Sequence, residues 1–297
     1  MTDTRTTIDV DQKSTIEGWG SGLLGVIIFS GSLPATRVAV ADFSPLFLTS
    51  ARAVIAALLA AVLLVMLRQV RPARHDITAL SIVMLGVVIG FPLLTALALQ
   101  YITSARSIVF IGILPLATAV FGVLRGGERP KPLFWTFSIL GSATVIGFAL
   151  SNSDGASLTG DLLMIAAVIL CGWGYAEGAV LSRRYGGWQV ICWALLLGLP
   201  FMLPLAIVTL PSTWGDITVP AWIGLAYVSV FSMLVGFVFW YRGLAIGGTA
   251  TVGQLQLLQP FLGLLLAGLL LGEHVAWTMI AAALLVVVFV ALAKKFA

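Results

Sequence analysis

Charged side chains are scarce in this sequence, since Asp, Glu, Lys and Arg together make up only 9% of its 297 residues. Soluble domains carry about 25% charged residues, whereas 60% of this chain is hydrophobic. A soluble fold of this length could not bury so much apolar surface, so the chain must be solvated by lipid. The basic residues stand singly between apolar runs, where they mark membrane topology and indicate no nucleic-acid partner.

Cysteine and histidine are also rare, with two residues of each type. Cys171 and Cys192 both lie inside apolar stretches, which is typical of small buried side chains and not of a disulfide or a metal site. His75 and His274 lie in predicted loops, far from any Cys or His that could complete a cluster. We therefore expect no catalytic residue, no metal and no cofactor.

Motifs of other classes of membrane protein are missing as well. The chain has no helical His-Glu pair, no Gly-x-Ser-x-Gly sequence and no phosphate-binding loop. These absences argue against a membrane-embedded enzyme and against ATP-driven transport. No polar filter or charged ring indicates a channel. We therefore favour a secondary carrier for small organic solutes.

Long apolar runs fill most of the sequence, and the connections between them are short. A membrane-spanning helix needs about 20 apolar residues. Ten such stretches fit, at approximately 18–40, 45–67, 77–99, 103–124, 132–150, 160–182, 188–209, 219–241, 249–271 and 275–294. The expected fold is an all-α polytopic membrane protein with ten transmembrane helices.

The distribution of Lys and Arg predicts how these helices are oriented. Most of the basic residues fall in alternate connections, such as those that hold Arg68, Arg125 and Arg183. Because cytoplasmic connections carry the excess of Lys and Arg, both termini should be cytoplasmic. Residues 1–17 are then a polar cytoplasmic tail, and they lack the features of a cleavable signal peptide.

One pattern of proline and glutamate occurs twice. Pro115 is followed 13 residues later by Glu128, and Pro260 is followed 13 residues later by Glu273. A glycine precedes each glutamate, and the two prolines lie 145 residues apart. The chain is therefore expected to contain one module twice.

The module predicts a first repeat over 18–150 and a second over 160–295. Each repeat has five helices, and because five is odd the second repeat must enter the membrane from the opposite side. The two would be inverted repeats, related by a pseudo-two-fold axis in the membrane plane. Such repeats suit transport by alternating access, although duplication is also an easy way to build a helix bundle.

These features together resemble the EamA-type branch of the drug/metabolite transporter (DMT) superfamily, over the chain from about Gly18 to Lys295. Within that branch the sequence resembles the YddG-type exporters of bacterial inner membranes. The resemblance implies export of aromatic amino acids and some other neutral metabolites. The first helix, 18–40, lacks the Asp or Glu that small multidrug-resistance relatives use for proton exchange, which argues against export of cationic drugs.

Small and polar side chains at helical spacing predict helix faces that are turned to protein or to a cavity instead of lipid. Several expected helices carry such a face, with prolines at which they could bend. The candidate substrate-binding residues are Thr95, Ser107, Trp173, Tyr175, Tyr227, Ser232, Gln256 and Gln259. The candidates for gating or coupling are Glu177, Pro34, Pro92, Pro115 and Pro260.

Two of these residues have an alternative interpretation. Gln256 could form a wall of the substrate path or a hydrogen bond between helices, since a mid-membrane amide is costly without a partner. Trp173 lies near mid-depth between two glycines, so it could pack against a neighbouring helix or stack with a flat, apolar solute.

Two charged residues are expected inside the membrane. Arg52 could attract a substrate carboxylate, but we favour outward snorkelling or helix bracing. Glu177 could be a proton site or a gate, but we favour a contact at the inner interface with Arg183, Arg184 or Arg242.

The scarcity of buried carboxylates favours a facilitator over a proton antiporter, for which Glu177 would be the coupling residue. A proton-coupled exporter of other metabolites or drugs is the alternative. The expected partners are a small-molecule substrate, such as an aromatic or other neutral amino acid, and the lipid bilayer. Ten helices could enclose a substrate path alone, which favours a monomer.

Overall fold

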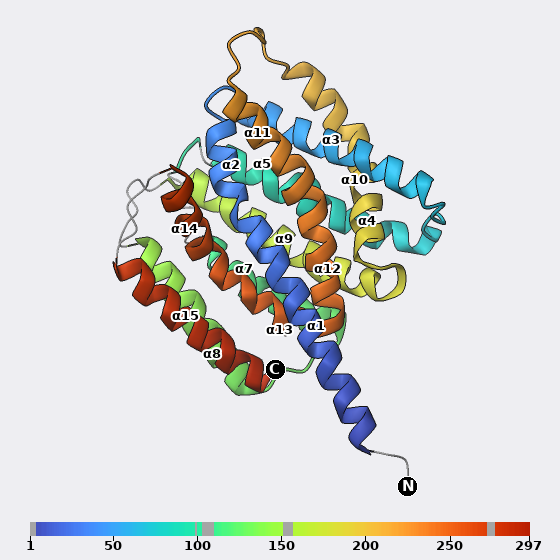
Figure 1. The fold of residues 1–297 in the computed structure, drawn as a ribbon, viewed down its shortest axis with the longest axis vertical. Coiled ribbons are helices and arrows are strands. Elements are labelled where there is room, and N and C mark those ends of the chain that lie inside the picture. The colour runs from blue at the N-terminus through green and yellow to red at the C-terminus, as the bar shows by residue number, and fades with distance from the viewer. Residues whose placement is uncertain (1–3, 99, 103–109, 151–156, 272–276) are drawn as a thin grey trace.

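The computed structural model describes residues 4–98, 100–102, 110–150, 157–271 and 277–297, and these are helical apart from their connections (Figure 1). Helix is present in every one of the ten ranges that the sequence predicts, as far as those ranges are described. The helix over the first range begins at Thr4, so most of the predicted tail continues that helix.

Six described segments are long and apolar enough to cross a membrane. They are Ile16–Thr36, Pro45–Met66, Arg74–Ala98, Leu158–Tyr185, Gly187–Val208 and Val219–Gly247. Two shorter apolar helices cover Leu114–Gly126 and Pro132–Phe148. Large apolar side chains are exposed on the outside, for example Val62, Ile207 and Val287. A surface of this kind is stable in lipid and not in water.

The helices of the first half are α1 (Thr4–Ser30), α2 (Ser32–Ala39), α3 (Pro45–Met66), α4 (Ile77–Val83), α5 (Phe91–Ala98), α7 (Leu114–Gly126) and α8 (Pro132–Leu150). A short 3-10 turn, η1 (Arg74–Asp76), precedes α4, and a π-helical segment, η2 (Met84–Gly90), joins α4 to α5.

The helices of the second half are α9 (Leu158–Tyr185), α10 (Gly187–Val208), α11 (Val219–Tyr227), α12 (Gly236–Gly247), α13 (Thr249–Gly253), α14 (Gln259–Leu271) and α15 (Trp277–Phe296). A π-helical segment, η3 (Val228–Val235), joins α11 to α12, and a 3-10 segment, η4 (Gln254–Leu258), joins α13 to α14.

The first membrane helix is interrupted at Gly31, between α1 and α2. Pro34 lacks a backbone N–H, so the carbonyl of Ser30 loses the donor that it would have in a continuous helix. The Tyr227 hydroxyl donates to the carbonyl of Ile28 at 2.9 Å, which satisfies another acceptor beside the break. The interruption lies in the segment where the sequence predicts that the helix could bend.

The same backbone irregularities recur at equivalent places in the two halves. The π-helical segments η2 and η3 both interrupt the third long helical range of their half, and their starts, Met84 and Val228, lie 144 residues apart. In the first half Pro92 follows the π turns, whereas the position 145 residues later holds Phe237. Proline alone therefore does not explain why both helices widen.

The two prolines of the repeated pattern also have equivalent positions. Pro115 is the second residue of α7 and Pro260 is the second residue of α14. Both sites suit proline, because the first turn of a helix leaves its N–H groups without internal partners. Each proline therefore begins a new helical segment instead of bending a continuous helix.

The halves pack through long helices that cross between them. α1 lies along α12, and α9 lies along α4 and α5, so the first long helix of each half contacts the third helical range of the other. α3 packs on α10, and α8 lies beside α15 at one edge of the molecule (Figure 1).

Two faces of the bundle are named for the residues at the helix ends. The Arg/Lys face is defined by residues 68–76, 125–131, 183–186 and 242–248, which several ion pairs join. The loop-40 face, at the other ends of the helices, is defined by residues 40–45, 100–102 and 209–218. On this face the Thr218 amide and hydroxyl donate to the Asp42 carboxylate at 2.8 and 2.6 Å.

The Asp42 contact depends on the ionised carboxylate. The hydrogen bonds from the Thr218 hydroxyl and amide hold the pKa of the Asp42 carboxyl below its usual value. The link between the two loops is therefore complete above the carboxyl's usual pKa, and it is lost as the pH falls through the lowered one.

α1 and α12 approach so closely that glycine is required at their contact. A Cβ on Gly243 would lie 2.6 Å from the Gly22 amide nitrogen, and a Cβ on Gly18 would lie 2.6 Å from the Gly247 nitrogen. Gly18 and Gly22, like Gly243 and Gly247, are four residues apart. Small residues at this spacing let two backbones pack in direct contact, which stabilises helix pairs in lipid.

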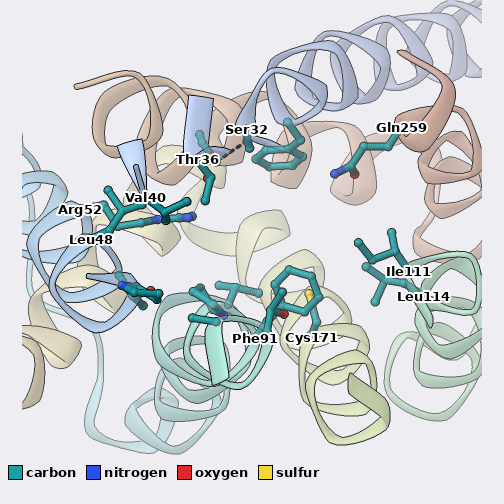
Figure 2. A pocket seen from close by; sticks show the side chains of 18 of the residues that line it. Ser32, Thr36, Val40, Leu48, Arg52, Phe91, Ile111, Leu114, Cys171 and Gln259 are labelled. Atoms are coloured by element: carbon teal, nitrogen blue, oxygen red, sulfur yellow. Dashed lines mark hydrogen bonds between the residues drawn. The ribbon is translucent and has the colours of Figure 1, made fainter. Parts of the chain in front are cut away.

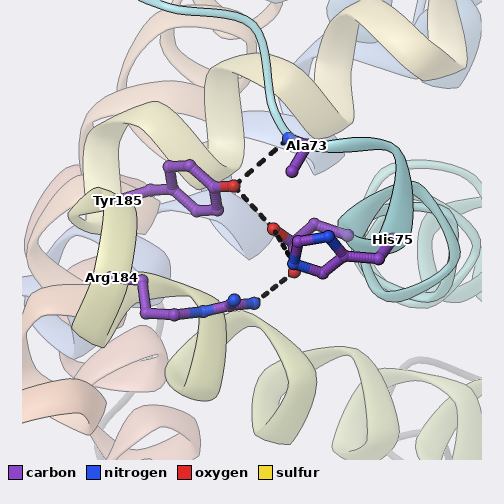
Figure 3. Close-up of polar contacts among 5 residues, drawn as sticks. Ala73, His75, Arg184 and Tyr185 are labelled. Atoms are coloured by element: carbon purple, nitrogen blue, oxygen red, sulfur yellow. Dashed lines mark hydrogen bonds and ion pairs between the residues drawn. The ribbon is translucent and has the colours of Figure 1, made fainter.

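On the Arg/Lys face a buried carboxylate joins the first half to the second. Asp76 is 2% exposed, and it accepts hydrogen bonds from the Tyr185 hydroxyl at 2.5 Å and from the Arg184 guanidinium (Figure 3). His75 Nε2 lies 3.3 Å from the same carboxylate, and the Ala73 amide donates to the Tyr185 hydroxyl. The cluster fixes the connection before α4 against the end of α9.

Replacement of Gly243 by alanine is expected to lower the free energy of unfolding by about 1–3 kcal/mol, because the added methyl group forces two backbones apart. Reversible unfolding in mixed micelles measures the difference. Gly20→Ala is the matched control, since a Cβ at that position of the partner helix α1 meets nothing within 4 Å. Equal stability of the two variants would contradict the direct backbone contact.

Replacement of Asp76 by alanine is expected to lower the free energy of unfolding by about 1–3 kcal/mol, because it leaves the partly buried Tyr185 and Arg184 groups without their acceptor. Asp216→Ala, on the exposed 209–218 connection, removes the same charge from a side chain that has no hydrogen bond or ion pair with another described residue, and it should change stability little. Thermal unfolding of both variants in detergent tests this expectation, which fails if their transitions coincide.

Candidate functional site

One cavity of about 540 Å³ lies between the two halves and reaches the loop-40 face. Its walls come from α2, α3, η2, α5, α9, α12 and α14, among other segments. Near the loop-40 face it is lined by Val40, Pro45 and Gln100, of which Val40 and Gln100 are exposed. The volume is within the range of small-molecule binding sites, about 300–1,000 Å³.

Aromatic rings form much of the inner wall. Phe29 and Phe237 come from different halves, and their ring centroids are 4.9 Å apart. Tyr175 packs on Phe237 at 6.2 Å, and Phe91 lines the wall beyond the π-helical segment η2. The inner part of the cavity therefore suits an apolar or aromatic body.

Hydroxyl and amide groups interrupt this apolar wall. The Ser32 hydroxyl donates to the Ser232 hydroxyl at 2.7 Å, which joins the first half to the second across the cavity wall. The hydroxyl of Thr95, a residue of the same wall, is buried and has no hydrogen-bond partner among the described residues. Gln259 adds an amide at the inner end. None of the described lining residues is Asp or Glu.

Among the described residues that line this wall, Arg52 is the cation. Its side chain points from α3 into the space between the helices, near Thr36 and Leu48 (Figure 2). The Arg52 Nε atom is buried and has no hydrogen-bond partner. The sequence favours snorkelling or helix bracing for this residue, whereas the structure places it in the cavity wall. A useful signal was the stripe of buried alanines that follows it on α3, Ala53, Ala56, Ala57 and Ala60, because it marks the face turned to the protein interior.

Five of the residues predicted from the sequence line the cavity. They are Pro92, Thr95, Tyr175, Ser232 and Gln259. They come from both halves, and the fold brings them around the same space. Ser107 lies outside the residues that the structure describes.

Other candidates lie elsewhere in the bundle. Trp173 stacks on Phe121, with ring centroids 6.0 Å apart, and does not line the cavity, which corresponds to the helix-packing interpretation. The Tyr227 hydroxyl is used at the break of the first helix. Gln256 is 1% exposed, and its amide lies near Tyr175 without hydrogen-bond geometry to any group. Pro34, Pro115 and Pro260 contribute through the backbone and also lie outside the cavity wall.

Glu177 does not line the cavity and lies toward the Arg/Lys face. Its carboxylate accepts from Arg125 Nε at 2.5 Å and from the Trp173 indole N–H at 3.3 Å. The preferred partners, Arg183, Arg184 and Arg242, are wrong: they pair instead with Glu128, Asp76 and Glu17. The missed partner, Arg125, ends α7, which packs against α9 in the tertiary structure.

The glutamate of the first Pro-Glu pattern closes the same face. Glu128 accepts hydrogen bonds from the backbone amides of Thr249 at 2.5 Å and Ala250 at 2.7 Å. These amides begin α13, where a carboxylate satisfies free N–H groups and interacts favourably with the helix dipole. Arg183 lies 3.5 Å from the same carboxylate. Glu273, the second glutamate of the pattern, lies outside the described residues.

Tightly packed side chains separate the cavity from the Arg/Lys face. Trp240 and Tyr241 are fully buried, and the Tyr241 hydroxyl donates to the Gly174 carbonyl at 3.3 Å. A methyl group on Gly178 would collide with the Tyr241 ring. The described residues that line the cavity include Val40, Pro45 and Gln100 of the loop-40 face and none of the Arg/Lys face, so the described lining is open toward the loop-40 face and closed toward the Arg/Lys face.

A membrane-embedded cavity that is open on one side, in an all-helical apolar bundle, defines a membrane transport protein. The profile of the EamA-like transporter family matches residues 18–150 and 158–294. The chain belongs to the EamA-like transporter family of the DMT superfamily.

Named relatives are also described as transporters. The chain is 63% identical over 285 residues to "Uncharacterized transporter YdeK" of Bacillus subtilis (strain 168), covering 96% of this chain and 99% of the relative. It is 25% identical over 258 residues to the "Probable terminal-alkyne amino-acid exporter" of Streptantibioticus cattleyicolor, covering 84% of each. A crystal structure with 18% sequence identity superposes with a TM-score of 0.77, over 96% of this chain and 97% of the other, which supports the fold.

The ion pair between Glu177 and Arg125 is expected to show a coupling energy of about 0.5–2 kcal/mol, because Glu177 is buried while Arg125 is half exposed. A double-mutant cycle with Glu177→Gln and Arg125→Gln measures it through unfolding free energies. Arg129→Gln, an exposed arginine on the same face, replaces Arg125→Gln in the control cycle, which should be additive. Additivity in both cycles would show that the pair contributes nothing specific.

Proposed function

We propose that this protein exports small neutral metabolites, with aromatic amino acids as the main substrates, by alternating access. The observation that carries the proposal is the cavity between the two halves, which is open at one face and closed at the other. Alternating access requires a site of this kind, located where two halves meet and reached from one side at a time.

The walls of the cavity support the choice of substrate. The rings of Phe29, Phe91, Tyr175 and Phe237 offer faces and edges to a flat apolar group, while Ser32, Thr95 and Gln259 offer hydrogen bonds. The relative from Streptantibioticus cattleyicolor is named an amino-acid exporter, which points to the same class of solute. The resemblance to YddG-type exporters favours amino acids with an aromatic side chain within that class.

Two inverted five-helix repeats, 18–150 and 160–295, would provide the two conformations. The two separate matches of the family profile, the equivalent π-helical segments and the equivalent proline-initiated helices support this architecture. If the repeats exchange conformations, the cavity closes at the loop-40 face and opens at the Arg/Lys face. The breaks at Gly31 and the segments around Pro92, Pro115 and Pro260 are the places where bending requires the fewest broken hydrogen bonds.

The contacts at the Arg/Lys face would then act as the inner gate. Opening on that side requires separation of α7 from α9, which breaks the Glu177–Arg125 pair, and separation of Glu128 from the start of α13. With the Arg/Lys face in the cytoplasm of a bacterial inner membrane and both termini on that side, substrate would enter here. A monomer contains the whole path.

The absence of a carboxylate among the described cavity residues favours a facilitator that runs down the solute gradient. Proton coupling is the alternative, and it would require Glu177 to exchange Arg125 for a proton during the cycle.

Flux into proteoliposomes that hold the purified protein tests the proposal. Radiolabelled phenylalanine is expected to show saturable flux and counterflow that do not depend on a pH gradient, and Glu177→Gln should retain this independence. Flux only in the presence of a pH gradient, lost in Glu177→Gln, would establish proton coupling instead. The absence of phenylalanine flux from folded protein would overturn the aromatic assignment.

A further inference from the structure

We infer that Arg52 binds the carboxylate of the transported solute, and that the cavity therefore selects organic acids and amino acids by their carboxylate and not by their amino group. The inference deepens the proposed function, because it names the chemical group that the same cavity recognises. It also differs from that proposal in one respect: it requires no amino group on the solute.

Arg52 lies in the cavity without an ionic partner. The ion pairs of the described residues use Arg125, Arg183, Arg184, Arg242 and His75, and Arg52 is within 4.0 Å of no described carboxylate. A guanidinium in a protein wall at membrane depth is costly unless an anion or water satisfies it. A carboxylate ligand provides the best match, because it can accept two parallel N–H bonds from the planar guanidinium.

The other lining residues disfavour a cationic ligand. None of those described is Asp or Glu, so an ammonium group would find only hydroxyl and amide oxygens. An amine without a carboxylate would also place a positive charge in the same low-dielectric space as Arg52. The charge of the cavity therefore selects for anions and zwitterions.

The position of Arg52 fixes the orientation of the ligand. Figure 2 shows Arg52 beside Thr36, Val40 and Leu48 at one end of the cavity, whereas Phe91 and Cys171 lie farther in and Gln259 lies toward the other end. A carboxylate bound at Arg52 would leave the apolar body of the ligand to lie against the rings of Phe91 and Tyr175. A cation at one end and aromatic rings farther in match an amphipathic acid of the size of an amino acid.

Ligand binding to purified full-length protein in detergent tests the inference directly. The probes are 3-phenylpropanoate, which has a carboxylate and no amine, phenethylamine, which has an amine and no carboxylate, and hexanoate, an acid without a ring. We expect 3-phenylpropanoate to bind and phenethylamine not to bind by equilibrium dialysis. Arg52→Gln should weaken binding of the acid by about tenfold to a hundredfold, the usual effect of losing a charged hydrogen-bonding partner.

Arg52→Lys separates geometry from charge. The lysine keeps the positive charge but cannot form the bidentate contact, so its binding of 3-phenylpropanoate should be intermediate. Arg71→Gln is the matched control, since this exposed arginine on the Arg/Lys face lies far from the cavity and should leave binding unchanged. Melting temperatures without ligand show whether each variant is folded. If Arg52→Gln does not fold, the lysine variant carries the test.

Equal affinity for the acid and the amine, unchanged acid binding in the folded Arg52 variants, or no acid binding at all would overturn the inference. Binding of hexanoate distinguishes failure of this inference from failure of the proposed function. Binding of both acids, each weakened by Arg52→Gln but without preference for the ring, would retain the carboxylate site and remove the support for aromatic substrates. Tighter binding of both 3-phenylpropanoate and phenethylamine than of hexanoate would keep the support for aromatic substrates and overturn the carboxylate site.

Discussion

The constraint on which this structure depends is that lipid offers no hydrogen-bond partner to the backbone. A helix in lipid can be interrupted only where protein or a water-accessible cavity satisfies the freed groups. The break at Gly31 follows this rule, because the carbonyl of Ile28 accepts from Tyr227 of the other half. The π-helical segment η2 adjoins Phe91 and Pro92, which line the cavity. Irregular backbone is therefore found around the cavity.

The same constraint explains why the two halves are interdigitated. Lipid does not drive apolar helices together as water does, so close packing and specific polar contacts must hold them. The glycines of α1 and α12 allow backbone contact, and the Ser32–Ser232 pair crosses the cavity wall. At the Arg/Lys face the carboxylates of Asp76, Glu128 and Glu177 each join segments that are distant in sequence. A helix motion that changes the cavity must therefore also change these contacts.

The distribution of charge divides the molecule into two functional regions. At the Arg/Lys face the carboxylates of Asp76, Glu128 and Glu177 are each paired with an arginine, and these pairs join segments at that end of the bundle. In the cavity Arg52 stands among hydroxyls, amides and rings. A paired charge stabilises one conformation, whereas an unpaired one remains available to a ligand. Arg52 and Glu177 both lie inside the bundle, yet only Arg52 lines the cavity.

The sequence by itself determined the membrane character and the helical ranges, because hydropathy acts over short distances along the chain. It marked possible bends at Pro34, Pro92, Pro115 and Pro260, but not the π-helical segment η3, after which Phe237 takes the place of Pro92. It also indicated Thr95, Tyr175, Ser232 and Gln259 as polar or aromatic residues on interior faces. Only the tertiary structure decided which of them share a cavity. For Trp173 the sequence allows either packing or stacking with a ligand, and in the structure its ring stacks on Phe121 outside the cavity wall. Arg125 as the partner of Glu177, and Arg52 as a cavity residue, depend on how α7 and α3 rotate against their neighbours, and that rotation is set by long-range packing that no local pattern encodes.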